Sequence, residues 1–178
     1  MKLSYKQAGV IKGMLLAMIC SLVVIFTAIN LDPLGYANSN HTSGRLAILG
    51  FSLLLPTLTL IISIARLAQF RFVSVEDIDS SGLTPGTSQA RLLQSLLQNT
   101  LEQLVIALAV YTACCLLMPA TWLSAVPLSS ILFTIGRIFF FKGYSRGAQG
   151  RAFGFALTFY PTVIMLLLLL AYQSTVLL

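Results

Sequence analysis

Long stretches without a charged residue dominate the chain. Charge-free windows cover residues 13–31, 46–65, 103–136 and 152–178. A helix needs roughly 20 apolar residues to cross the hydrocarbon core of a bilayer, so the third window is too long for one crossing. Pro119 lies near the middle of that window, where a tight turn would divide it. The pattern therefore predicts five transmembrane helices.

The first window has an alternative interpretation as a cleaved secretory signal, because Lys2, Lys6 and Lys12 precede it. The apolar core of a signal peptide is about 7 to 15 residues long and ends at a small-x-small cleavage site. This window is longer and no convincing Ala-x-Ala follows it. We therefore favour a helix that is retained in the protein.

Composition excludes the soluble classes of protein. The 178 residues are 57% hydrophobic and 9% charged, with a mean hydropathy of +0.91. A soluble domain carries about 25% charged residues, so these few charges cannot cover a water-facing surface. The chain is expected to be an all-α integral membrane protein, neither a soluble enzyme nor a disordered chain, and it is long enough for one compact domain.

The basic residues predict an orientation. With five spans, the N-terminus and the loops at 66–91 and 142–151 share one face, and only Arg45 remains for the other. Lys and Arg are retained on the cytoplasmic side in short loops, so we expect a cytoplasmic N-terminus and an outer C-terminus. The net charge of +6 then reflects topology and contacts with anionic membrane lipid, and does not indicate nucleic-acid binding.

Two apparent motifs carry no chemistry. Cys20, Cys114 and Cys115 lie inside apolar windows without Cys-x-x-Cys spacing, which predicts packing and no metal site. The segment 143–147 fits Gly-x-Ser-x-Gly, but that nucleophile motif requires a strand, a turn, a helix and a histidine base. The single histidine, His41, is predicted on the opposite face, so the sequence disfavours serine hydrolysis.

Polar residues lie just before the third window, in the same predicted helix. The sequence at 85–88 predicts a turn with an N-cap, so a helix should begin near Ser88 and end near Met118. Counted from its outer end, this helix reaches the inner membrane surface near Asn99 and carries Glu102 about one turn deeper. A buried acidic residue costs on the order of 3 kcal/mol and needs a partner. Helical spacing places one set of polar residues on a single face: Arg91, Ser95, Gln98 and Glu102.

The same counting brings residues of the other helices to this depth. The shared level contains Arg66, Asn99, Glu102, Arg137, Tyr144 and Arg151. One interpretation is that Asn99 and Glu102 form hydrogen bonds between helices, while the arginine side chains extend to the membrane surface. A single carboxylate among several cations favours the other interpretation, a polar pocket for a small anionic or zwitterionic ligand.

Two motifs among these residues resemble the MAPEG superfamily, membrane-associated proteins in eicosanoid and glutathione metabolism. Residues 98–103, Gln-Asn-Thr-Leu-Glu-Gln, are similar to the signature of the family's second helix. Gly136-Arg137 followed by 143–151 is similar to the loop between helices three and four of the leukotriene-forming synthases. A weaker similarity, to the segment after the family's first helix, is carried by Arg66, Phe72 and Glu76-Asp77. The resemblance covers roughly residues 46–175.

The resemblance implies a four-helix transmembrane domain over 46–178, preceded by an additional N-terminal transmembrane helix and outer loop over 1–45. It also implies a homotrimer that binds glutathione, as co-substrate, between protomers near the cytoplasmic surface. Asn99 and Glu102 would hydrogen-bond glutathione together with Gln98. Arg137 and Tyr144 would line the pocket, and Arg66 would reach a glutathione carboxylate.

Arg151 matches the family's arginine that faces the glutathione sulfur. A cysteine thiol titrates near 8.5, and a fixed guanidinium beside it stabilises the thiolate. The thiolate would attack a lipophilic small-molecule electrophile dissolved in the bilayer. The resemblance thus implies a membrane-bound glutathione transferase or peroxidase.

Three positions depart from the family pattern. Ser95 stands where several members carry an arginine, Phe140 replaces a site tyrosine, and Gln103 stands where leukotriene-forming enzymes have another tyrosine. Fewer cationic and phenolic contacts imply weaker glutathione binding or a different ligand. The alternative hypothesis is a non-catalytic lipid-binding or scaffold protein of the same fold. A transporter is disfavoured because the sequence shows no inverted repeat.

Overall fold

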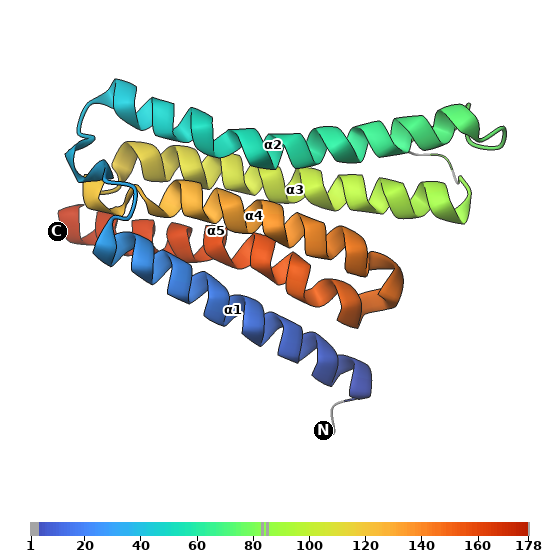
Figure 1. Cartoon of the computed structure of the whole chain (residues 1–178), viewed down its shortest axis with the longest axis horizontal. Coiled ribbons are helices and arrows are strands. Elements are labelled where there is room, and N and C mark those ends of the chain that lie inside the picture. Colours follow the sequence, from blue (N-terminus) through green and yellow to red (C-terminus); the bar gives the residue numbers. More distant parts are fainter. Residues whose placement is uncertain (1–3, 83, 85, 178) are drawn as a thin grey trace.

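The computed structural model describes residues 4–82, 84 and 86–177, and these residues form helices without any strand. Three short 3₁₀ turns, η1 (Tyr36–Asn38), η2 (Ala120–Trp122) and η3 (Tyr144–Arg146), connect longer helices. Figure 1 shows the long helices: α1 (Tyr5–Leu31), α2 (Thr42–Val73), α3 (Ser88–Leu117), α4 (Ala125–Gly143) and α5 (Gly147–Leu177). The predicted all-α class is confirmed.

Four helical stretches among the described residues are long and apolar enough to cross a membrane. They are α1, α2, α3 and the continuous stretch Ala120–Val176. The last contains α4 and α5, which fold back on each other at η3 (Figure 1). The protein is therefore a multi-pass membrane protein, as its hydropathy predicted.

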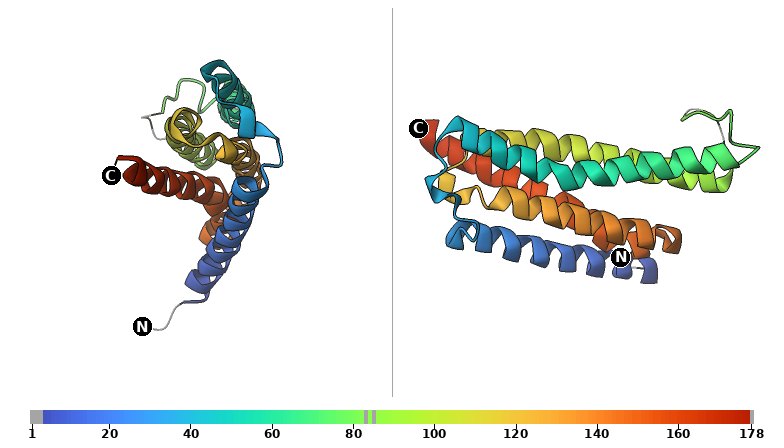
Figure 2. Two further views of the ribbon diagram at one scale, coloured as in Figure 1. Left: turned by 90° about the vertical axis from the view of Figure 1, so that its left-hand side faces the viewer. Right: turned by 45° about the horizontal axis from the view of Figure 1, so that its top comes forward.

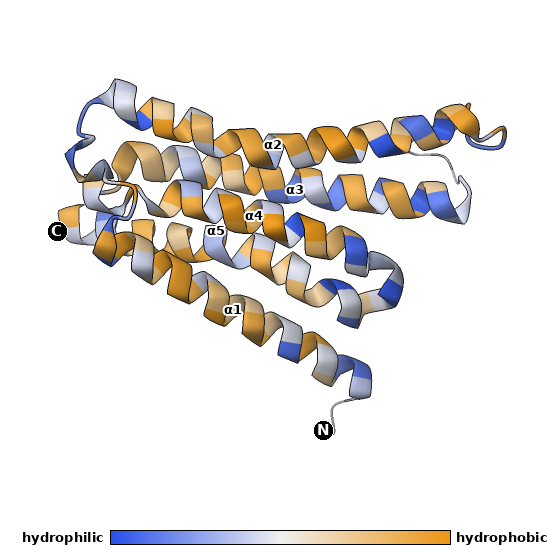
Figure 3. Ribbon diagram, viewed as in Figure 1, coloured by the Kyte–Doolittle hydropathy of each residue, from blue (hydrophilic) through white to orange (hydrophobic). Residues whose placement is uncertain are grey.

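The helices lie side by side in a bundle. α2 packs on α3, α4 packs on α5, and α1 lies against the outer side of α5 (Figures 1 and 2). The start of α1, the α2–α3 loop and η3 share one end, while the C-terminus, η1 and η2 share the other (Figure 1). Figure 3 shows hydrophilic residues at both ends of the bundle; the start of α1 and the basic segments at 66–91 and 142–151 lie at the first of these ends. This is the grouping of basic segments predicted from sequence; the side of the membrane that this end faces stays a prediction.

Two glycines allow α4 and α5 to approach closely. A Cβ atom at Gly154 would lie 2.2 Å from the backbone nitrogen of Phe140, and one at Gly136 would lie 2.8 Å from that of Thr158. Small residues permit such backbone contact between membrane helices. The close crossing fixes Arg137 and Phe140 of α4 against α5, beside the site described below.

The start of α3 is anchored by the preceding loop. Thr87 is the N-cap and accepts a hydrogen bond from the Ala90 backbone. The Asp77 carboxylate accepts from the Thr87 backbone nitrogen at 2.9 Å, from its hydroxyl at 2.6 Å and from Ser74 Oγ at 3.0 Å. These bonds, chiefly that from the Thr87 hydroxyl, hold the pKa of Asp77 below its ordinary value of 3.8. The predicted helix start at Ser88 is confirmed, while Pro85 of the predicted turn lies outside the described residues.

Candidate functional site

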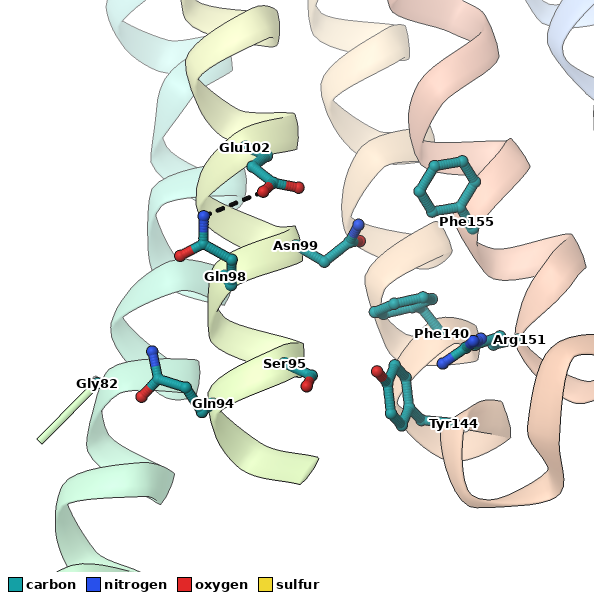
Figure 4. Close-up of a pocket in the computed structure, with 10 residues that line it drawn as sticks. All are labelled: Gly82, Gln94, Ser95, Gln98, Asn99, Glu102, Phe140, Tyr144, Arg151 and Phe155. Carbon is teal, nitrogen blue, oxygen red and sulfur yellow. Dashed lines mark hydrogen bonds between the residues drawn. The ribbon is translucent and has the colours of Figure 1, made fainter. Parts of the chain in front are cut away.

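A polar cavity of about 520 Å³ opens between α3 and the α4–η3–α5 hairpin at the hydrophilic end of the bundle (Figure 4). Small-molecule sites usually measure about 300–1,000 Å³, so this cavity can hold a ligand of that class. Its lining residues are Gly82, Gln94, Ser95, Gln98, Asn99, Glu102, Phe140, Tyr144, Arg151 and Phe155.

One wall of the cavity is a face of α3. Ser95, Gln98, Asn99 and Glu102 all line it, because spacings of three and four residues bring side chains to the same side of a helix. Gln98 Nε2 donates to Glu102 Oε1 at 3.0 Å (Figure 4). The carboxylate therefore has a polar partner on its own helix. Of the residues predicted to share one face, Ser95, Gln98 and Glu102 line the cavity, whereas Arg91 does not.

The opposite wall comes from both sides of the η3 turn. Tyr144 begins η3 and Arg151 lies in the second turn of α5. Gly147, with φ of +77°, lets the chain reverse between them. The Arg151 guanidinium carbon then lies 4.6 Å from the centroid of the Tyr144 ring, and Tyr144 meets Phe140 edge-on at 5.3 Å. This cation–π contact holds a positive charge at the cavity wall.

Arg137 lies behind the wall and is not among the lining residues. It is fully buried, and its Nη1 donates to Asn99 Oδ1 at 2.9 Å while its Nε donates to Thr158 Oγ1 at 3.1 Å. Its guanidinium carbon lies 4.4 Å from the Phe140 ring centroid. Within the described part of the chain, Arg137 Nη2 has no hydrogen-bond partner. Arg137 therefore orients the Asn99 amide, whose Nδ2 remains a donor.

Arg66 is not brought to this cavity within one chain. It lies exposed on α2 and lines a separate cavity with Gln69 and Gln89. Its guanidinium carbon is 6.0 Å from the Phe141 ring centroid. Of the residues predicted from sequence, the structure thus brings five to the cavity: Gln98, Asn99, Glu102, Tyr144 and Arg151.

Three lining residues were not predicted. Gln94 precedes Gln98 by four residues and Phe155 follows Arg151 by four, so helical spacing was a usable signal for both. Gly82 belongs to the α2–α3 loop, and no sequence pattern indicated that the loop would fold over the cavity.

An apolar groove of about 250 Å³ lies on the α1 side of Arg151. It is lined by Val10 and Met14 of α1, by Ala148 and Ala152 of α5, and by Phe140, Arg151 and Phe155, which also line the polar cavity. Arg151 therefore lies between a polar and an apolar space.

Among the described residues, no group of three or more His, Cys, Asp or Glu side chains could hold a metal ion.

Comparison with known proteins gives one match. The family model described as the MAPEG family matches residues 46–171. No curated protein and no solved structure matches the chain. The match includes every residue that lines the polar cavity, whereas α1 lies outside it.

Proposed function

The chain belongs to the MAPEG family, since the family model covers more than half of its length, and from this premise we propose that it is a membrane-bound glutathione transferase or peroxidase. Glutathione would occupy the polar cavity and its thiolate would attack a lipophilic electrophile. The observation that carries the proposal is that Glu102 and Arg151 line one cavity of about 520 Å³.

The cavity offers complementary groups for a zwitterionic tripeptide. The Glu102 carboxylate suits the ammonium group of glutathione, and the amides of Gln98 and Asn99 suit its peptide bonds. Because Arg137 already occupies Asn99 Oδ1, the Asn99 NH₂ group is directed to the ligand as a donor. Polar groups that are held in place before binding lose little entropy when the ligand arrives.

Arg151 supplies the positive charge for the thiolate. A free cysteine thiol has a pKa of about 8.5, and a neighbouring guanidinium lowers it; each unit of lowering corresponds to about 1.4 kcal/mol. The sulfur then forms a bond to an electrophilic carbon, and with a chlorinated nitrobenzene the carbon–chlorine bond breaks and chloride leaves with its electron pair. Arg151 is the catalytic residue of this proposal, and Tyr144 positions it.

The apolar groove on the α1 side of Arg151 supports a lipophilic second substrate. An apolar cavity of about 150 Å³ can bind benzene, and this groove measures about 250 Å³. An aromatic or short aliphatic group there would lie next to the residue that holds the thiolate.

We further propose a homotrimer with a cytoplasmic N-terminus and the cavity near the cytoplasmic face. Glutathione is available in the reducing cytosol, which is the side that the basic residues indicate. Arg66 is exposed on α2 and away from the cavity of its own chain. A neighbouring protomer in the trimer would let Arg66 reach a glutathione carboxylate.

Catalysis by Arg151 is tested with the variant Arg151→Ala. Conjugation of a chlorinated nitrobenzene should be abolished, and the ultraviolet absorbance of bound thiolate should disappear, because the stabilising charge is gone. Arg146→Ala is the matched control: Arg146 is exposed at the same end and does not line the cavity. Turnover by Arg151→Ala equal to that of the control would refute the mechanism.

A second candidate function is a non-catalytic lipid-binding or scaffold protein. It is favoured by the three departures from the family pattern: the Ser95 hydroxyl donates to the Arg91 carbonyl at 2.8 Å, Phe140 carries no phenol, and Gln103 is buried. In this case Glu102→Gln should lower the stability of the oligomer while calorimetry detects no glutathione binding to the wild type.

A further inference from the structure

α1 contributes two side chains, Val10 and Met14, to the apolar groove beside Arg151. The other residues that line this groove belong to α4 and α5. The segment matched to the family begins at residue 46, so it contains the α4 and α5 parts of the groove but not the α1 part. Two side chains outside the matched segment therefore border the space next to the candidate catalytic residue.

Close packing of α1 on α5 sets the position of these two side chains. Val10 precedes Gly13 by three residues and Met14 follows it directly. A Cβ atom at Gly13 would lie 3.0 Å from the Phe153 backbone nitrogen and 3.4 Å from the Ala152 Cβ, an approach that small residues permit between membrane helices. Because Ala152 also lines the groove, the groove begins directly beside this helix contact, and the contact fixes its width.

The groove is open at the surface of the protein. Met14 and Phe155 both line it and are both exposed. The charge-free part of α1 begins at residue 13, so this surface lies where the hydrocarbon core of a bilayer would begin. Among the described residues that line the groove, Arg151 alone is charged, and it also lines the polar cavity. A lipophilic molecule that enters from the membrane would reach Arg151 through this groove.

We propose that Val10 and Met14 determine which electrophiles the protein accepts, by limiting the size of the apolar group that can lie beside Arg151. This inference rests on the proposed function. The preferred substrate is an electrophile with one aromatic ring or a short chain, whose reactive carbon faces Arg151 and whose apolar part lies against α1.

The volume of the groove supports this size limit. A cavity of about 150 Å³ can bind benzene, and the groove measures about 250 Å³. One ring with chloro and nitro substituents would use most of this space. A second fused ring would press on the side chains of α1, since the close contact at Gly13 holds α1 and α5 together.

Two aryl chlorides that differ by one ring test the proposal: a dinitrated chlorobenzene and a dinitrated 1-chloronaphthalene. Both lose chloride to the glutathione sulfur, so the ratio of their kcat/KM values, each divided by the uncatalysed rate, reports the fit of the apolar part. One methylene in an apolar pocket changes such a ratio by about tenfold or more. Val10→Phe narrows the groove and should raise the preference for the single ring about tenfold. Met14→Ala widens it and should lower that preference about tenfold.

Leu15→Phe is the matched control, because Leu15 is exposed on α1 and does not line the groove. Its ratio should equal that of the wild type. If Val10→Phe disrupts folding, Met14→Ala alone carries the test, since the Met14 side chain is exposed.

A ratio that is unchanged in the folded variants, or that moves in the opposite direction, would overturn this inference and leave the proposed function intact. The same holds if the rates with both compounds fall together, because a merely structural role for α1 would lower them without regard to substrate size. Absence of conjugation of either compound by the wild type would overturn both the inference and the proposed function.

Discussion

At the scale of the residue, arginines that sequence places at one depth occupy different environments. Arg137 is fully buried and holds Asn99, whereas Arg151 is held over Tyr144 at the cavity wall. Arg45, at the other end of the bundle, donates to the carbonyls of Cys115 and Met118 where α3 ends. A charged group in a membrane protein needs polar partners or water; Arg137 and Arg45 have hydrogen-bond acceptors, while Arg151 lies against an aromatic ring and lines a polar cavity.

Asp77 makes stability depend on pH. Its pKa is lower in the folded protein than its ordinary value of 3.8, chiefly through the hydrogen bond from the Thr87 side chain. The carboxylate therefore contributes its full stabilisation above about pH 4 and loses it as the pH falls through the folded-state pKa. Asp77→Asn should lower the thermal midpoint at pH 7, and the difference from wild type should narrow at pH 3.

Thermal unfolding in detergent, followed by intrinsic fluorescence, measures this effect. Asp79→Asn is the control, because Asp79 is an exposed carboxylate in the same loop. A difference between Asp77→Asn and wild type that stays constant from pH 7 to pH 3 would contradict the assigned role.

At the scale of the element, a neighbouring helix compensates the break that a proline makes in α2. Pro56 within α2 cannot donate to the carbonyl of Ser52, four residues earlier. The Ser130 hydroxyl of α4 donates to that carbonyl instead. Similarly, the close crossing of α4 and α5 depends on glycine in both helices, and it positions the hairpin that carries Tyr144 and Arg151.

Gly154→Ala should disturb this crossing. The new methyl group would lie 2.2 Å from the Phe140 backbone nitrogen, so the helices would have to move apart, at a cost of about 1–3 kcal/mol. The thermal midpoint should fall, and glutathione affinity should fall with it because the hairpin that carries Tyr144 and Arg151 is distorted. Gly50→Ala is the control, since a Cβ there contacts nothing within 4 Å of the same chain. Equal midpoints for the two variants would show that the close crossing is not required.

At the scale of the whole molecule, α1 adds a wall that the family match does not include. The match begins at residue 46, yet Val10 and Met14 line the apolar groove beside Arg151. α1 reaches α5 through Gly13, where a Cβ would lie 3.0 Å from the Phe153 backbone nitrogen. The additional helix is thus packed against the candidate site.

Glutathione should stabilise the assembled protein. A ligand that binds only the native state adds about 2.7 kcal/mol at one hundred times its Kd, so the thermal midpoint should rise with glutathione concentration. Native mass spectrometry of the same sample should detect three copies of the chain. A midpoint that does not respond to glutathione in a protein of correct mass would favour the scaffold hypothesis, and a monomeric or dimeric mass would refute the trimer.

Sequence by itself determined the membrane class, the five long helices, the start of α3 and the polar face with Gln98 and Glu102. These features depend on composition, on local capping and on the helical repeat, all of which can be read along one segment. Tertiary structure decided that Arg137 lies behind Asn99, that Arg66 lies apart, and that α1 brings Val10 and Met14 to the groove beside Arg151. Those positions depend on how each helix is rotated about its axis and how closely α4 meets α5, and residue depth alone specifies neither.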